Sequence, residues 1–349
     1  MSEQTPSTVN ESAAPTQAAP PEKSGNVMQR LLSGAAGRNL GLIIALVLLI
    51  VVGAVTAGDR FMNVENFLTI IRFASIIGVI SIGMTFVITA GGIDLSVGSV
   101  MGLATVVASL SWVQAAADQT SWLLMVAVAL AVGGAAGLVN GVIIAYGKVV
   151  PFMATLAMLV AARGLAELLS NKTTQIVSVQ GFLEFFRGDF LGIAWLVWIF
   201  VIAAVVGWFL LSRTTFGRRT VAIGGNFEAT RLAGIRVKRH LVALYVLVGL
   251  SAGIAAVMML GRTTAGTSTH GALYELDAIA AVVVGGTLLV GGRGTIFGTV
   301  LGVLIFSTLT NVFTQNNLSQ SVQAVVKGVI IVVAVLLQQR FASRPGRSS

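Results

Sequence analysis

The sequence predicts an all-α integral membrane protein of about ten transmembrane helices. Of its 349 residues, 56% are hydrophobic and only 10% are charged, whereas an average soluble domain has about 25% charged residues. Several runs between charged residues are uncharged and at least as long as the roughly 20 residues that cross a bilayer as a helix. A transmembrane β-barrel would instead show weak alternating segments of about ten residues.

The two ends of the chain differ from this pattern. Residues 1–25 hold four of the six prolines with many Ser, Thr, Ala and Gln residues, a composition that cannot bury a core. We therefore predict a disordered cytoplasmic tail over 1–38, a transmembrane domain over 39–340 and a cytoplasmic tail over 341–349. The first apolar run, which begins near Leu40, lacks the pattern of a cleaved signal peptide and is interpreted as a membrane anchor.

Charged residues separate the predicted spans, and the eighth is the weakest because it is short and starts beside Glu275 and Asp277. Pro151 stands at a helix start, where its missing N–H costs nothing. In chain order the predicted spans are 39–58, 73–93, 95–117, 119–147, 151–169, 192–211, 241–260, 274–290, 295–313 and 320–339.

Ten spans place both termini on one side of the membrane. That side would hold 15 of the 22 Lys and Arg residues, seven of them in the loop 212–240. Because cytoplasmic loops are enriched in Lys and Arg, we expect both termini and this loop to be cytoplasmic. The net charge of +9 then reflects these loops and not a nucleic-acid partner.

Glycines recur in two informative patterns. Spacings of four, as in Gly133, Gly137 and Gly141, allow close helix packing in lipid. Gly-Gly pairs at 91–92 and 291–292 begin similar stretches at an offset of 200. An internal repeat, common in transporters, is one explanation of the offset, and chance matching of glycine-rich helices is the other.

The loop 212–240, "SRTTFGRRTVAIGGNFEATRLAGIRVKRH", favours a short helix of about two turns. Asn226 is a good N-cap, and Glu228 lies in the first turn, where the helix dipole favours an anion. Gly234 can end the helix in a left-handed conformation. The alternative is an ordinary solvated loop.

Charged residues near the membrane are candidates for a transport pathway or gate, because such residues usually face protein or water. Asp94, in "ITAGGIDLSVGSV", either caps the third helix through the N–H groups of Leu95 to Val97 or lines the path. Arg163 and Glu167 are one turn apart and can pair, and Lys327 can reach an interface by snorkelling. The full set of pathway candidates is Asp94, Ser96, Arg163, Glu167, Asn311 and Lys327.

Several kinds of chemistry are missing from the sequence. It has no G-x-x-x-x-G-K-[ST] phosphate-binding loop, no H-E-x-x-H pair and no Ser/His/Asp set. With no Cys and two His residues, we predict no metal site and no catalytic residues. A binding or transport role remains.

Three stretches resemble the permease subunits of bacterial ABC importers for sugars, of the ribose/xylose/galactose type. They are "ITAGGIDLSVGSV" (88–100), "FGRRTVAIGGNFEATRLAGIRV" (216–237) and "GALYELDAIAAVVVGGTLLVGGRGTIFGTVLG" (271–302). The resemblance runs from about Asn63 to Leu337 and keeps the order and spacing of such permeases.

The resemblance implies a transport subunit of the bacterial inner membrane and not an enzyme. It implies a second permease subunit, identical or homologous, a cytoplasmic ATPase that holds ATP and Mg²⁺, and a periplasmic sugar-binding protein that delivers a monosaccharide; this chain itself would bind no cofactor. The segment Glu228-Ala229-Thr230-x-x-x-Gly234 resembles the E-A-A-x-x-x-G signature that contacts the ATPase, although its Ile-x-Leu-Pro ending is absent. The coupling residues implied are Asn226, Glu228, Ala229, Arg231 and Gly234.

Two alternative functions stay open. A permease for branched-chain amino acids would share the packing pattern, but match "GGIDLS" and "YELDAIAAVVVGG" less closely. A free-standing secondary transporter or channel would need ion-coupling groups at mid-membrane and no loop for docking an ATPase.

Overall fold

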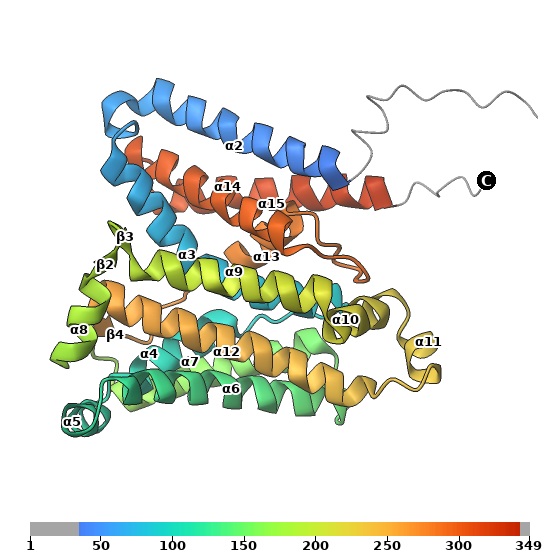
Figure 1. Ribbon diagram of the computed structural model, residues 1–349, viewed down its shortest axis with the longest axis horizontal. Helices are drawn as coiled ribbons and strands as arrows, with labels where there is room; N and C mark the ends of the chain where they lie inside the picture. The colour runs from blue at the N-terminus through green and yellow to red at the C-terminus, as the bar shows by residue number, and fades with distance from the viewer. Residues whose placement is uncertain (1–34, 343–349) are drawn as a thin grey trace, which may run out of the picture. The chain divides into compact units, whose positions relative to one another are not determined.

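The structure is a computed structural model that describes residues 35–342 (Figure 1). Of the predicted tails, residues 1–34 and 343–349 lie outside the described residues. The helices are α2 (Ala35–Ala57), α3 (Val64–Thr89), α4 (Val97–Ala108), α5 (Ser111–Gln119), α6 (Leu123–Ala145), α7 (Pro151–Ser170), α8 (Gln180–Arg187), α9 (Trp195–Arg213), α10 (Thr215–Gly225), α11 (Phe227–Leu232), α12 (Val237–Thr263), α13 (Tyr274–Val284), α14 (Ile296–Gln315) and α15 (Gln320–Ala342), with a 3₁₀ turn η1 (Gly58–Arg60).

The four strands are two residues long and form two antiparallel pairs. Strand β1 (Gln175–Ile176) pairs with β4 (Ala265–Gly266), and β2 (Asp189–Phe190) pairs with β3 (Ile193–Ala194). The protein is therefore all-α in architecture, as the sequence predicts.

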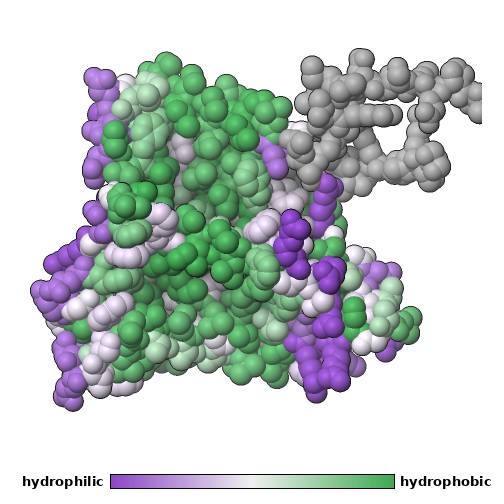
Figure 2. All heavy atoms as spheres, in the orientation of Figure 1, coloured by the Kyte–Doolittle hydropathy of each residue, from purple (hydrophilic) through white to green (hydrophobic). Residues whose placement is uncertain are grey.

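Within the described residues, seven helices are long and apolar enough to cross a membrane, namely α2, α3, α6, α7, α9, α12 and α14. On the face shown in Figure 2, hydrophobic residues cover the middle and hydrophilic residues gather towards the two ends. In Figure 1, α10 and α11 lie at one end of these helices, called here the α11 end, and α5, α8 and β2–β3 lie at the other, called the α8 end. This is a multi-pass membrane protein.

The third predicted span is broken into two helices. α4 and α5 are bent by 58° at a short break. The side-chain amide of Gln114 donates to the backbone carbonyl of Ser109 at 2.7 Å, which satisfies an acceptor that the break leaves without a helical partner. Counted as one span, the pair makes an eighth crossing.

The eighth predicted span, 274–290, is wrong as a full crossing. Its helix α13 has 11 residues, about 16 Å at 1.5 Å per residue, whereas the hydrocarbon core is about 30 Å thick. The helix stops at Gly285, and Gly286 has a φ of +90°. Apolar composition continues past this point in the sequence, but the backbone leaves the helical conformation.

The core forms around α3, which packs against α12, α14, α9 and α13. α6 approaches α12 closely through glycines: a Cβ on Gly141 would lie 2.8 Å from the Cα of Val242, and Gly133 contacts Gly249 and Gly253. The predicted packing role of the four-residue glycine spacing is confirmed for this helix pair.

Candidate functional site: a polar cavity and a loop helix at opposite ends

The loop 212–240 contains the predicted short helix. In α11, Asn226 is the N-cap, and its side chain accepts a hydrogen bond from the backbone N–H of Ala229 at 2.9 Å. Gly234 follows the helix with a φ of +80°, in the left-handed region that favours glycine. Glu228 and Arg231 form an exposed ion pair of 2.9 Å. The loop also contains α10, which was not predicted, although Thr214 caps it with its hydroxyl oxygen.

Three Gly-Gly pairs meet at the base of this loop, and we call them the glycine junction: 91–92, 224–225 and 291–292. The backbone N–H of Gly292 donates to the carbonyl of Thr89, the last residue of α3, at 2.8 Å. A Cβ on Gly224 would lie 2.5 Å from the nitrogen of Gly292 and would also overlap the Thr89 carbonyl oxygen. The loop therefore touches, backbone to backbone, both the end of α3 and the segment before α14.

Asp94 is buried beside this junction. Its Oδ1 accepts hydrogen bonds from the backbone N–H and the hydroxyl of Ser96, at 2.8 and 2.6 Å. The N-cap residue of α4 is Ser96 and not Asp94, so Asp94 stabilises the turn before the helix through the N–H of Ser96. Burial raises the pKa of the Asp94 carboxyl, and the hydrogen bonds from Ser96 offset only part of the effect.

Asn140 of α6 extends this buried polar cluster. Its amide donates to the Ser96 hydroxyl at 3.0 Å, so the α4 start is tied to α6. The Asn140 Oδ1 and the Tyr245 hydroxyl have no hydrogen-bond partner among the described residues.

The predicted Arg163–Glu167 pair is wrong. Glu167 lies 3.7 Å from Lys172, and Arg163 donates instead to the backbone carbonyl of His270 at 3.1 Å. The segment before α13 packs against α4 and α7, and this brings a carbonyl acceptor within reach of the guanidinium. Burial and then the charge of Arg163 lower the pKa of His270 to about 4.

A cavity of about 530 Å³, called here the polar cavity, lies between α3, α13, α14 and α15. It occupies the half of these helices towards the α8 end, because it is formed by the first part of α3 and the last part of α14. Its lining residues are Arg60, Asn63, Glu65, Asn66, Thr69, Ile70, Phe73, Ile77, Tyr274, Asp277, Ser307, Thr310, Asn311, Thr314, Gln315 and Lys327.

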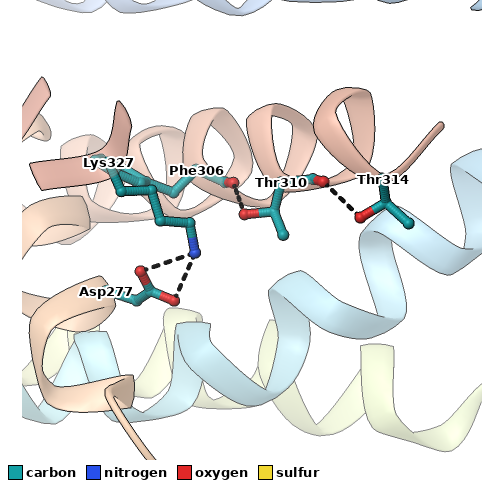
Figure 3. Close-up of polar contacts among 5 residues, drawn as sticks. All are labelled: Asp277, Phe306, Thr310, Thr314 and Lys327. Atoms are coloured by element: carbon teal, nitrogen blue, oxygen red, sulfur yellow. Dashed lines mark hydrogen bonds and ion pairs between the residues drawn. The ribbon is translucent and has the colours of Figure 1, made fainter. Parts of the chain in front are cut away.

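Lys327 makes an ion pair in the wall of the polar cavity (Figure 3). Its Nζ donates to both carboxylate oxygens of Asp277, at 3.1 and 3.0 Å. The two side chains are 19% and 18% exposed, so the pair is shielded but can be reached from the cavity. It ties α15 to the short helix α13.

Asn311 belongs to an amide cluster that joins α3 to α14. Its amide donates to Asn66 Oδ1 at 2.7 Å and its Oδ1 accepts from Asn66 at 3.0 Å, while Gln315 also donates to Asn66. Two of the six predicted pathway candidates, Asn311 and Lys327, therefore line the cavity, and the other four do not.

A second cavity, of about 960 Å³, opens at the α11 end beside α11 and is called here the basic cavity. Its charged lining residues are Glu228 and five basic residues, namely Lys148, Arg231, Arg236, Lys238 and Arg239. The two cavities share no lining residue in the described part of the chain. Between them, the hydroxyls of Thr85 and Thr299 are hydrogen-bonded across α3 and α14 at 2.8 Å.

Most residues of the polar cavity were not among the predicted pathway candidates. The available signal was a stripe of polar residues on one face of the apolar helix α14, at positions 307, 310, 311, 314 and 315, which follows the spacing of a helix surface. Its counterpart on α3, Asn66 and Thr69, is only one turn long.

A bundle of spanning helices with a polar cavity towards one end and a capped loop helix at the other is compatible with a membrane permease. The chain belongs to the family described as branched-chain amino acid transport system / permease component, which matches residues 66–335.

Named relatives in this family include sugar permeases. The chain is 41% identical over 316 residues to the ribose import permease protein RbsC of Bacillus subtilis, covering 90% of this chain and 94% of the relative. It is 36% identical to the L-arabinose ABC transporter permease protein AraH of Azospirillum brasilense, covering 86% and 87%. It is 33% identical to the xylose transport system permease protein XylH of Escherichia coli, covering 80% and 86%. No solved structure gives a significant match.

Proposed function

We propose that this chain is the permease subunit of an ATP-driven importer and forms the membrane pathway for a monosaccharide. The observation that carries the proposal is the match, over most of both chains, to relatives named as ribose, arabinose and xylose permeases. The hydroxyl and amide groups of the polar cavity support a sugar over a branched-chain amino acid, whose side chain needs an apolar pocket.

The α11 end faces the cytoplasm in this proposal, because seven basic residues lie in the loop 212–240. The α11 helix then docks on a cytoplasmic ATPase, which holds ATP and Mg²⁺. The docking residues are Asn226, Glu228, Ala229, Arg231 and Gly234. Asn226 and Gly234 fix the ends of the helix, and Glu228 and Arg231 are 65% and 62% exposed for contact.

The polar cavity opens to the other side, which is the periplasm of a bacterial inner membrane. A periplasmic binding protein releases the sugar there, and a second permease subunit, identical or homologous, completes the pathway. Asn311 and Lys327 lie on this path. Asp94 and Ser96 hold the start of α4, and Arg163 ties α7 to the segment before α13 through the His270 carbonyl. These three act by positioning helices, whereas Glu167 pairs locally with Lys172.

The glycine junction gives this proposal a route for coupling. Motion of α11 reaches α10 and then, through direct backbone contact, Thr89 at the end of α3 and Gly292 before α14. α3 and α14 also form two walls of the polar cavity. A shift of the loop can therefore change the cavity without any long side-chain relay.

Copurification tests the proposal. The chain, expressed with the genes that flank it and extracted in mild detergent, should retain an ATPase, and the double variant Asn226→Ala with Gly234→Val should lose it. Lys172→Ala, at the opposite end of the molecule, is the control and should retain the ATPase. An importer that takes up sugar with no associated ATPase would instead be a secondary transporter.

A further inference from the structure

The charges that line the polar cavity balance. Arg60 and Lys327 contribute two positive charges, and Glu65 and Asp277 contribute two negative ones. These four lining charges by themselves favour neither a cation nor an anion, and a further cation, Arg262, lies against the wall residue Phe73. The remaining polar lining consists of hydroxyl and amide groups, which pair well with a neutral ligand rich in hydroxyls.

The Asp277–Lys327 pair keeps hydrogen-bonding capacity for such a ligand. A lysine ammonium has three donors, and two of the contacts of Lys327 go to Asp277. A carboxylate can accept about four hydrogen bonds. Asp277 can thus accept a hydrogen bond from one sugar hydroxyl, and Lys327 can donate one to another, while the ion pair stays intact.

The hydroxyls on α14 are of two kinds. Thr310 and Thr314 donate their own hydrogens to backbone carbonyls one turn earlier, at 2.8 and 2.9 Å (Figure 3), and so can only accept from a ligand. Ser307 differs, because its hydroxyl has no hydrogen-bond partner among the described residues although the residue is only 6% exposed. A buried hydroxyl without a partner is costly, and its position in the cavity wall points to a ligand.

Two aromatic side chains complete the wall. Phe73 and Tyr274 both line the cavity, and the guanidinium of Arg262 lies 3.5 Å from the ring centroid of Phe73. That cation fixes the Phe73 ring, which then offers an apolar surface to the C–H groups of a sugar ring. Polar groups that orient the ligand beside apolar walls are the usual composition of a small-molecule site.

We infer that Ser307, Asp277 and Lys327 form a binding site for a neutral cyclic polyol within the membrane part of this chain. This inference rests on the proposed function and locates a binding site for the sugar along the pathway. The ion pair binds the sugar in the polar cavity, and the Ser307 hydroxyl hydrogen-bonds it at the buried wall. A branched-chain amino acid fits less well, because its apolar side chain would face hydroxyl and amide groups.

Saturation-transfer NMR with millimolar D-ribose tests the site on the full chain in lipid nanodiscs. We expect transfer to the sugar from the unmodified chain, and a decrease of at least about threefold for Ser307→Ala, at an unchanged melting temperature. Ser75→Ala is the matched control, because that serine is fully buried, donates to the Ile71 carbonyl at 2.7 Å and does not line the cavity. Equal signals from Ser307→Ala and the unmodified chain would overturn the assignment of Ser307.

An exchange of the two charges separates a structural role of the ion pair from a binding role. Asp277→Asn and Lys327→Gln should each lower the D-ribose signal by at least about threefold. The double variant Asp277→Lys with Lys327→Asp restores an ion pair and should restore the melting temperature, but not the signal, because donor and acceptor have changed places. Full recovery of the signal in the double variant would show that the pair only holds α13 to α15.

The site and the proposed function fail in different ways. ATP-driven D-ribose uptake by the complete importer, without saturation transfer to D-ribose on the permease, would overturn the site and leave the proposed function standing. Uptake without an ATPase would overturn the proposed function. Saturation transfer to L-leucine and not to D-ribose would overturn the assigned ligand class.

Discussion

The glycine junction allows a sharp test of coupling through two neighbouring residues. A Cβ at Gly224 would overlap the carbonyl oxygen of Thr89 and lie 2.5 Å from the nitrogen of Gly292. These are backbone atoms, which cannot move aside as the tip of a side chain can. A Cβ at Gly225 would meet no heavy atom within 4 Å, so Gly225→Ala is a matched control in the same helix.

Overpacking of this kind costs about 1–3 kcal/mol, which corresponds to a change of about 5- to 140-fold in the population of the packed junction. We therefore expect Gly224→Ala to lower ATP-driven uptake by at least about fivefold while Gly225→Ala stays within about twofold of the unmodified chain. Uptake into proteoliposomes at matched permease content measures this, with ATP hydrolysis recorded in parallel. If both alanines had the same effect, the close contact at Gly224 would not carry the coupling.

The remaining predictions concern the loop, the topology and the nucleotide. Gly234→Val forces a β-branched residue to the φ of +80° found there, a strain of about 1–3 kcal/mol. Glu228→Lys puts a cation in the first turn of α11. Both variants should insert in the membrane but lose uptake, with the ATPase either detached or no longer responsive to the loaded binding protein. Normal uptake in both, with the ATPase bound, would make the loop a linker. A reporter fused after Arg219 should be cytoplasmic and one within 178–189 periplasmic, and finding both on one face would contradict the orientation. The purified chain should neither bind nor hydrolyse ATP, since it lacks a phosphate-binding loop, and specific nucleotide binding that survives removal of contaminating ATPase would contradict this.

The helices and the loop were predictable because their signals are local. Uncharged runs set the spans, and Asn226 and Gly234 mark the ends of α11 by their own backbone and capping preferences. Local signals also explain the error at α13, where apolar residues continue beyond Gly285 while the helix does not.

The cavity was not predictable in the same way, because its residues come from four helices. Lys327 and Asp277 are 50 positions apart, and Asn66 and Asn311 are 245 apart. No spacing rule within one helix identifies such partners. The same reason explains Arg163, whose acceptor is the distant His270 carbonyl and not the carboxylate one turn away.

The most direct test of the central claim is uptake of radiolabelled D-ribose by proteoliposomes that contain this chain, its ATPase and the binding protein. We expect uptake only when the permease, the ATPase and the binding protein are all present and ATP is supplied on the side of the membrane that holds the ATPase. Uptake should not change when ion gradients are collapsed. Uptake driven by a proton or sodium gradient in liposomes holding this chain alone would contradict it.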